Sequence, residues 1–254
     1  MNRCSLGDRM KEYEAVPKNF LTRRTPVIMR LDGKAFHSFT RGFNKPFDSI
    51  LMRTMQMTML ELCKEIQGAV IGYTQSDEIT IVLQDYKNID TDAWFGYNVQ
   101  KMTSIGSSYC TFFFNDSLRR IADKAYENDL ITLDKMLLIE QILAIGAFFD
   151  CRVFNVPKEE VNNCLIWRQQ DAERNSIQAL AQSLYSHKQL EGISCKQLQD
   201  KMFTEKGVNW NDLSVPEKRG SCAINDETDG WIIDYNIPIF TQDTAYVNDR
   251  LIFD

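Results

Sequence analysis

Two aspartates stand where predicted strands begin or end. Asp32 directly follows the short apolar segment 27–31, which is typical of a buried strand, and Asp77 lies in the short connection between two further predicted strands, 69–74 and 79–83. Each aspartate alone is equally typical of an ordinary turn. Together in one cleft, two carboxylates repel each other unless a cation is bound between them. Mg²⁺ is the expected cation, because it takes hard oxygen ligands and shares them with substrate phosphates.

This pair of carboxylates predicts phosphoryl-transfer chemistry. Two Mg²⁺ ions about 3.5–4 Å apart can hold the attacking and leaving oxygens of such a reaction. Lys34 and Lys45 follow Asp32 in the sequence, and a compact ammonium group suits a phosphate. Either lysine fits a solvated surface charge equally well. We therefore predict that Asp32 and Asp77 are catalytic residues that bind metal.

The predicted elements decide whether the two aspartates meet. Their order from residue 27 to 156 is strand, helix, strand, strand, helix, strand, which is the split β-α-β-β-α-β pattern. In that arrangement the first and third strands are antiparallel neighbours at the sheet centre, so Asp32 and Asp77 lie at the same sheet edge. Besides the strands given above, we expect helices over 48–67, 92–107, 118–125 and 133–144, and strands over 110–114 and 151–156.

The fold class is therefore predicted as α+β, with a polymerase-type palm and a mainly helical C-terminal extension. We place the palm-like catalytic domain at 1–156 and the extension at 157–254, packed on the palm as one compact unit because no linker composition separates them. Within the extension, we expect helices over 158–167, 171–190 and 194–205, and a short strand pair at 219–224 and 231–235.

Composition excludes several classes of protein. The chain has 254 residues, a net charge of −6 and only two histidines, so a histidine-rich zinc site or a hydrolase triad is disfavoured. Its seven cysteines form no Cys-x-x-Cys pair, and the N-terminus lacks an apolar signal region, which favours a reduced, cytoplasmic protein. No apolar run approaches the roughly 18 residues of a membrane span. An acidic protein must bind nucleic acid through a local basic patch.

The sequence around both aspartates resembles the tRNA-His guanylyltransferase family. The nucleotide-binding block of that family is similar to residues 30–37 (RLDGKAFH) and to residues 73–78 (YTQSDE). Further similarity is found at Phe39, 45–46, 48–49, 149–150, 152–153, 167–169, Asp171, Lys206 and 219–220. The resemblance runs from about residue 27 to 220.

The resemblance implies an enzyme that adds nucleotides to the 5′ end of tRNA in the 3′-to-5′ direction, after ATP- or GTP-dependent activation of that end. Its partners would be tRNA, GTP, ATP and other NTPs, and it would form a homotetramer. By the same resemblance, two Mg²⁺ ions would be held by Asp32, Asp77 and the carbonyl of Gly33. The nucleotide would be bound by these three residues together with Lys34, Ala35, Phe36, His37, Lys45 and Ser76. The tRNA or its 5′ phosphate would contact Arg168, Asn175, Lys206 and Arg219.

Two features depart from the family pattern. Glu173 stands where eukaryotic members carry a histidine, and only Asn175 remains of an asparagine pair. The chain is therefore most similar to the bacterial and archaeal guanylyltransferase-like proteins, which implies template-dependent repair of truncated tRNA. Between residues 85 and 107 the only basic side chains are Lys87 and Lys101, fewer than a triphosphate-binding helix would provide.

Three alternatives are weighed against this prediction. A nucleotide cyclase or dinucleotide synthase would need no RNA and suits the acidic charge, but it would not share the later blocks. A non-catalytic RNA-binding protein would not need both Asp32 and Asp77. An enzyme restricted to guanosine addition to tRNA-His is disfavoured by Glu173 in place of the histidine.

Overall fold

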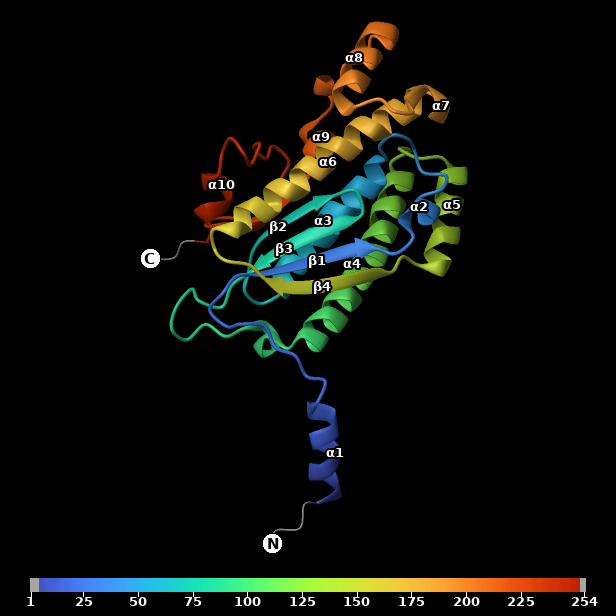
Figure 1. The fold of residues 1–254 in the computed structure, drawn as a ribbon. Helices are drawn as coiled ribbons and strands as arrows, with labels where there is room; N and C mark the ends of the chain where they lie inside the picture. The colour runs from blue at the N-terminus through green and yellow to red at the C-terminus, as the bar shows by residue number, and fades with distance from the viewer. Residues whose placement is uncertain (1–4, 252–254) are drawn as a thin grey trace.

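A six-stranded antiparallel sheet forms the centre of the molecule in this computed structural model, which describes residues 5–251 (Figure 1). The strand order is β4-β1-β3-β2-β5-β6. The strands are β1 (Val27–Gly33), β2 (Ala69–Gln75), β3 (Glu78–Leu83), β4 (Phe149–Asn155), β5 (Ser221–Asp226) and β6 (Gly230–Asp234).

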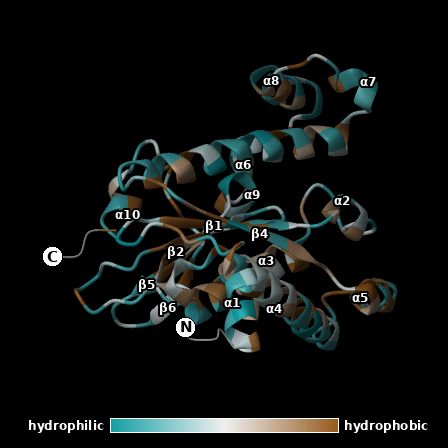
Figure 2. Ribbon diagram, turned by 60° about the horizontal axis from the view of Figure 1, so that its bottom comes forward, coloured by the Kyte–Doolittle hydropathy of each residue, from teal (hydrophilic) through white to brown (hydrophobic). Residues whose placement is uncertain are grey.

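Helices cover both faces of the sheet. Figures 1 and 2 show α3 and α4 on one face and α6 on the other, while α1 stands away from the body and has no buried residue. The helical elements are α1 (Leu6–Ala15), α2 (Phe36–Phe39), α3 (Ser49–Glu65), η1 (Trp94–Tyr97), α4 (Val99–Glu127), α5 (Leu133–Ile145), α6 (Glu160–Leu184), α7 (His187–Leu190), α8 (Cys195–Lys206), η2 (Trp210–Asp212), α9 (Val215–Arg219) and α10 (Ala245–Asn248). None of those described is long and apolar enough to cross a membrane.

Strand β1 contributes to two cores because successive side chains point to opposite faces. Met29 and Leu31 belong to the core that contains Met59 of α3, whereas Ile28 belongs to the core that contains Leu165 of α6. The polar residues Arg30 and Asp32 share the α6 side with Ile28. This alternation places Asp32 on the α6 side of the sheet, at the C-terminal end of a strand that is anchored on both faces.

The predicted order of palm elements is confirmed. Helices separate β1 from β2 and β3 from β4, β2 and β3 form a hairpin as expected, and β1 pairs with β3 in the antiparallel sense. The α+β fold class is confirmed with it. The predicted strand at 110–114 is wrong, because these residues continue the 29-residue helix α4. The helices predicted at 158–167 and 171–190 are one helix, α6, followed by the single turn α7.

A glycine helps to explain why part of α4 was wrongly predicted as a strand. Gly106 lowers the helical propensity of the segment that precedes the wrongly predicted strand. A Cβ at Gly106 would lie 3.2 Å from the sulfur of Cys151 and 3.3 Å from that of Met29. The glycine therefore allows α4 to cross the sheet closely, which is a tertiary requirement that local propensity does not reveal.

The C-terminal part of the chain joins the same sheet. Strand β5 pairs with β2, with Cys222 opposite Tyr73, and β6 extends the sheet beyond it. The strand pair expected at 219–224 and 231–235 is thus present with slightly shifted ends. The division into 1–156 and 157–254 stays a prediction, and the pairing of β5 with β2 favours treating both parts as one folding unit.

Candidate active site

The end of β1 meets the β2–β3 turn as the element order predicts. Asp32 is paired in register with Glu78, and the backbone N–H of Gly33 donates to the carbonyl of Asp77 over 3.1 Å. Asp150 on β4 lies opposite Asp32 on the other side of the strand. The structure therefore brings Asp32 and Asp77 together at one edge of the sheet.

Both predicted metal ligands are carboxyl groups with raised pKa values. Burial is the main cause of the raised pKa of Asp32, and the neighbouring charges of Glu78 and Asp150 add to it. Burial also raises the pKa of Asp77, partly offset by a hydrogen bond from Ser76 and increased by the charge of Asp32. An acidic pair that disfavours its own ionisation is a site where a bound cation is strongly stabilising.

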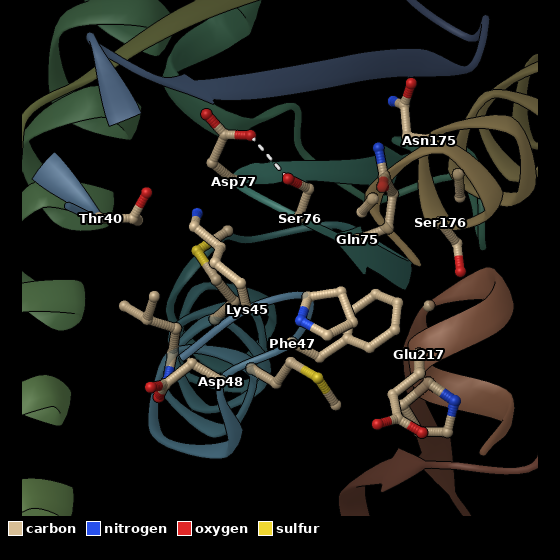
Figure 3. A pocket seen from close by; sticks show the side chains of 18 of the residues that line it. Thr40, Lys45, Phe47, Asp48, Gln75, Ser76, Asp77, Asn175, Ser176 and Glu217 are labelled. Carbon is tan, nitrogen blue, oxygen red and sulfur yellow. Dashed lines mark hydrogen bonds between the residues drawn. The ribbon is translucent and has the colours of Figure 1, made fainter. Parts of the chain in front are cut away.

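The tight turn between β2 and β3 orients Asp77. Gln75 and Glu78 are paired in register, which leaves Ser76 and Asp77 as a two-residue turn. Ser76 has a φ of 51°, in the left-handed region, and its hydroxyl donates to the Oδ1 atom of Asp77 over 3.1 Å. Figure 3 shows this hydrogen bond at the pocket wall. Such strained backbone is typical of functional turns.

Gly33 is required by close packing rather than by its own dihedral angles. A Cβ there would lie 2.2 Å from the ring of Phe36. That ring is buried and packs against Phe39, Phe114 and Phe149, so Phe36 is foremost a core residue that anchors α2 beside the predicted metal ligands. Lys34 and Ala35 are exposed in the connection between Gly33 and α2.

A pocket of about 430 Å³ opens beside Asp77 (Figure 3). Its walls come from the α2–α3 segment, the β2–β3 turn, the middle of α6 and the region of α9. Of the predicted site residues, it is lined by Phe36, His37, Lys45, Ser76, Asp77 and Asn175. Lining residues that the sequence did not single out include Thr40, Asn44, Gln75, Ser176, Glu217 and Lys218.

Lys45 lies on a segment that is anchored by Asp48. The Asp48 carboxylate caps α3 by accepting from the backbone N–H groups of Ile50 and Leu51, and it also accepts from the N–H of Asn44. Lys135 of α5 pairs with the same carboxylate at 3.0 Å. Figure 3 shows Lys45 pointing toward the turn that carries Ser76 and Asp77. The cap of α3 thus fixes the segment that presents the predicted phosphate-binding lysine.

Buried charges lie directly behind this turn. The carboxylate of Glu78 accepts from Arg30 and from Arg168, with both N–O distances at 2.6 Å. Arg168 also pairs with Asp171 at 2.9 Å, and its side chain is almost fully buried. The structure therefore places Arg168 inside the protein, where it holds two carboxylates, rather than on a surface open to tRNA.

The remaining predicted tRNA contacts lie in three different places. Asn175 of α6 lines the pocket. Arg219 forms an ion pair with Glu173 over 3.4 Å, and burial still raises the pKa of Glu173. Lys206 ends α8, which packs against the C-terminal half of α6 and, as Figure 1 shows, lies away from the sheet. Lys206 is therefore not brought together with the carboxylate pair.

The donor set fits a metal that shares its coordination with substrate. Across residues 5–251, no group of three or more His, Cys, Asp or Glu side chains is placed to form a metal cage. Asp32 and Asp77 supply two carboxylates, and Gly33 adds a backbone carbonyl. Mg²⁺ is commonly held by one or two carboxylates together with substrate phosphates and water. The set is thus compatible with Mg²⁺ and unlike a structural zinc site.

A palm sheet with paired carboxylates beside a nucleotide-sized pocket defines a palm-type nucleotidyltransferase. The model of the tRNAHis guanylyltransferase family matches residues 7–157, which is more than half of the chain. The chain belongs to this family. The predicted recognition and the predicted class of enzyme, a tRNA guanylyltransferase-like nucleotidyltransferase, are thereby confirmed.

Solved structures of bacterial proteins are similar over nearly the whole chain. A bacterial tRNA(His) guanylyltransferase (Thg1)-like protein in complex with ATP superimposes with a TM-score of 0.85 and 41% identity, covering 97% of this chain and 99% of that one. One in complex with GTP has a TM-score of 0.79 and 36% identity, covering 97% and 98%. The protein R259 of Acanthamoeba polyphaga mimivirus is 29% identical, covering 97% of this chain and 87% of its own length.

Two site residues next to the predicted pair were missed by the sequence reasoning. Asp150 and Glu78 were both inside segments that carried the family resemblance, yet neither was given a role. The missing information was the register, which places both directly opposite Asp32. The available signal was an acidic residue at the start of each neighbouring strand, Glu78 in β3 and Asp150 in β4.

Proposed function

We propose that this protein adds nucleotides to the 5′ end of tRNA in the 3′-to-5′ direction, using template-dependent pairing to repair truncated ends. The observation that carries the proposal is that Asp32 meets Asp77, and that Asp77 lies in the wall of a pocket also lined by Lys45 and Asn175. The bacterial relatives that share most of this fold are solved with ATP and with GTP. We infer that the pocket takes the same class of ligand.

Asp32, Asp77 and the Gly33 carbonyl would hold two Mg²⁺ ions. When bound, these ions would supply charge stabilisation to the oxygens of the transferred phosphoryl group. The Ser76 hydroxyl keeps Asp77 oriented by donating to it. Lys45 would bind the triphosphate, because its segment is fixed by Asp48 and its side chain points toward the turn that carries Asp77.

A 5′-monophosphate end would be activated by attacking the α-phosphate of ATP or GTP, which joins AMP or GMP to that end and releases pyrophosphate. The 3′-hydroxyl of the incoming nucleotide would then attack the activated 5′ phosphate, forming a new phosphodiester bond and releasing AMP, GMP or, from a 5′-triphosphate, pyrophosphate. Lys218 and His37 line the same pocket and add cationic or polar donors for phosphate oxygens. His37 already belongs to the predicted nucleotide-binding set, and Lys218 extends it.

The ion pair between Glu173 and Arg219 supports a role in repair. An ionised carboxylate paired with a guanidinium only accepts hydrogen bonds, so Glu173 cannot donate a proton as an imidazole group can. The step that depends on the histidine in eukaryotic members would therefore differ here. Selection of the nucleotide by the opposing template base requires no such side chain.

The direct test offers the enzyme a 5′-truncated tRNA and a full-length tRNA-His with each of the four NTPs, ATP and Mg²⁺. We expect growth of the truncated 5′ end, and a switch from GTP to UTP when the opposing base is changed from C to A. Addition of GTP against every opposing base would contradict templated repair. A product formed from NTPs without tRNA would instead favour a cyclase or dinucleotide synthase.

A further inference from the structure

Trp167 on α6 is exposed although tryptophan is usually buried. Its exposed fraction is 52%, whereas Trp94 and Trp210 are buried and Trp231 is partly buried. The guanidinium carbon of Arg168 lies 4.5 Å from the Trp167 ring centroid, and that of Arg30 lies 5.1 Å away. The ring therefore has cationic neighbours within contact distance and an open surface toward solvent.

The position of this ring is fixed by the buried charges beneath it. Arg30 and Arg168 both donate to Glu78, and all three side chains are largely buried. Glu78 directly follows Asp77 in the chain, so the same network holds the catalytic turn and the tryptophan. A residue that only covered this network would be expected to bury its ring, but half of the Trp167 surface remains accessible.

Trp167 is also close to the predicted metal ligands. Arg30 and Asp32 lie on the same face of β1 and are two residues apart, which corresponds to about 7 Å along a strand. Arg152 of β4 is paired in register with Arg30, so it lies on that face as well. The exposed ring, the strand end and the β4 edge thus form one continuous surface next to the site of reaction.

Two exposed arginines flank this surface. Arg152 pairs with Asp150 at 3.1 Å, and Arg174 pairs with Asp171; both guanidinium groups remain more than half exposed. A guanidinium has five N–H donors, so these single pairings leave donors for a further anion. Arg30 and Arg168 contact the Trp167 ring, and the exposed Arg152 and Arg174 supply the guanidinium donors that remain accessible on this surface.

We propose that Trp167 is a stacking platform for an unpaired nucleobase of the RNA strand whose 5′ end reacts at Asp32 and Asp77. This inference rests on the proposed function. Exposed aromatic rings bind splayed bases by stacking, which tolerates any base because every base has a π face. Arg152 and Arg174 are placed to meet the phosphates on either side of the stacked base.

Intrinsic fluorescence tests the platform, because Trp167 is the most exposed of the four tryptophans. Titration of the parent protein with a 5′-truncated tRNA should change the tryptophan emission. In Trp167→Phe this change should be lost, while the affinity for tRNA stays within about three-fold because phenylalanine still stacks. Trp167→Ala should weaken tRNA binding by about ten-fold or more. The matched control Trp231→Phe, at the far edge of the sheet, should keep the parent signal and affinity.

Each arm has a defined outcome. An emission change that persists in Trp167→Phe, or parent-like tRNA affinity in a folded Trp167→Ala, would overturn the platform. A Trp167-dependent change with ATP alone would also overturn it, because the stacked base would belong to a mononucleotide. Nucleotide transfer by a parent protein whose emission shows no Trp167-dependent change with tRNA would overturn this inference but leave the proposed function. A Trp167-dependent signal with tRNA but no transfer would support the platform and remove the proposed function.

Discussion

Among single residues, Asp77 has the clearest conflict between stability and function. Its carboxyl pKa is raised in the folded protein, chiefly by burial, so the folded state binds its proton more tightly than the unfolded state does. The charged form therefore destabilises the metal-free fold at neutral pH, and this cost disappears as the pH falls below the ordinary pKa of about 4. A cation bound to Asp77 would offset this cost.

Asp77→Asn should accordingly raise the melting temperature of the metal-free protein at pH 7 and have no effect near pH 3.5. The asparagine keeps an oxygen for the Ser76 hydroxyl but removes the charge. Differential scanning calorimetry with and without MgCl₂ measures both states. Mg²⁺ should stabilise the parent, since it binds only the folded form, and should stabilise the variant much less.

The matched control for this comparison is Asp200→Asn, an exposed carboxylate on α8. It should melt like the parent at both pH values and keep the response to Mg²⁺. Nucleotide transfer should be abolished in Asp77→Asn and retained in the control. Transfer by Asp77→Asn at the parent rate would contradict its assignment as a metal ligand.

Ser76→Ala tests how the turn tunes its neighbour. The Ser76 hydroxyl stabilises the charged form of Asp77, so its removal should raise the pKa of Asp77 further. The rise of Mg²⁺-dependent transfer with pH should then shift to higher pH. Thr40→Ala is the matched control, because that hydroxyl also lines the pocket but donates to the carbonyl of Phe36. Identical pH profiles in the parent and Ser76→Ala would exclude this coupling.

Part of this site is predictable from residue types alone. Asp32 and Asp77 were found because strand-ending carboxylates are visible in a sequence. The contribution of Glu78 was hidden, because its meaning depends on two arginines that are 48 and 90 residues away in the chain. The family resemblance implies a tRNA contact for Arg168, and the sequence does not reveal that this side chain is buried and paired with Glu78 and Asp171.

At the scale of elements, the α3 cap connects helix stability to nucleotide binding. Asp48→Ala should lower the free energy of unfolding by about 1–2 kcal/mol through loss of the cap. The substitution should lower the free energy of unfolding further, because the mostly buried Lys135 loses its ion-pair partner. The affinity for ATP should fall as well, since the segment that carries Lys45 loses its anchor. Urea denaturation and ATP titration measure the two effects.

Asp48→Asn separates the two roles of this side chain. Asparagine is as good a cap as aspartate, so the N–H groups of Ile50 and Leu51 keep an acceptor while the ion pair is lost. Its stability should lie between those of the parent and Asp48→Ala. Equal stabilities of the two variants would mean that capping contributes nothing measurable here.

Elements with a strong periodic pattern were predictable, and the others were not. The helix at 48–67 and the strands on either side were visible because apolar spacing and caps agree. The segment 110–114 contains Cys, Thr and three Phe, which favour a strand locally. It forms helix because Phe114 and Cys110 pack into the core beneath the sheet, so tertiary burial outweighs local propensity.

At the scale of the whole molecule, charge is distributed unevenly. A net charge of −6 opposes approach of nucleic acid, so productive binding depends on where the cations lie. The arginines near Trp167 form one group, and the lysines of α8 form another, where α8 packs against α6 away from the sheet. The homotetramer stays a prediction, which multi-angle light scattering tests directly, and it would multiply both groups.

Lys206 is the residue through which the second group is tested. It is exposed at the end of α8, lies 5.6 Å from the ring of Tyr185 and is distant from the carboxylate edge. Each phosphate contact contributes about 0.9 to the slope of log affinity against log salt for a duplex. Lys206→Ala should therefore weaken tRNA binding and lower this slope by about one unit.

Lys64→Ala is the control for this measurement, because Lys64 lies in the last turn of α3 and pairs with Glu61. It should leave the salt slope unchanged. The affinity for ATP without tRNA should be the same in both variants and the parent, since neither lysine lines the pocket. An unchanged slope in Lys206→Ala would remove α8 from the tRNA path. The exposed arginines near Trp167 would then be the next residues to test by the same measurement.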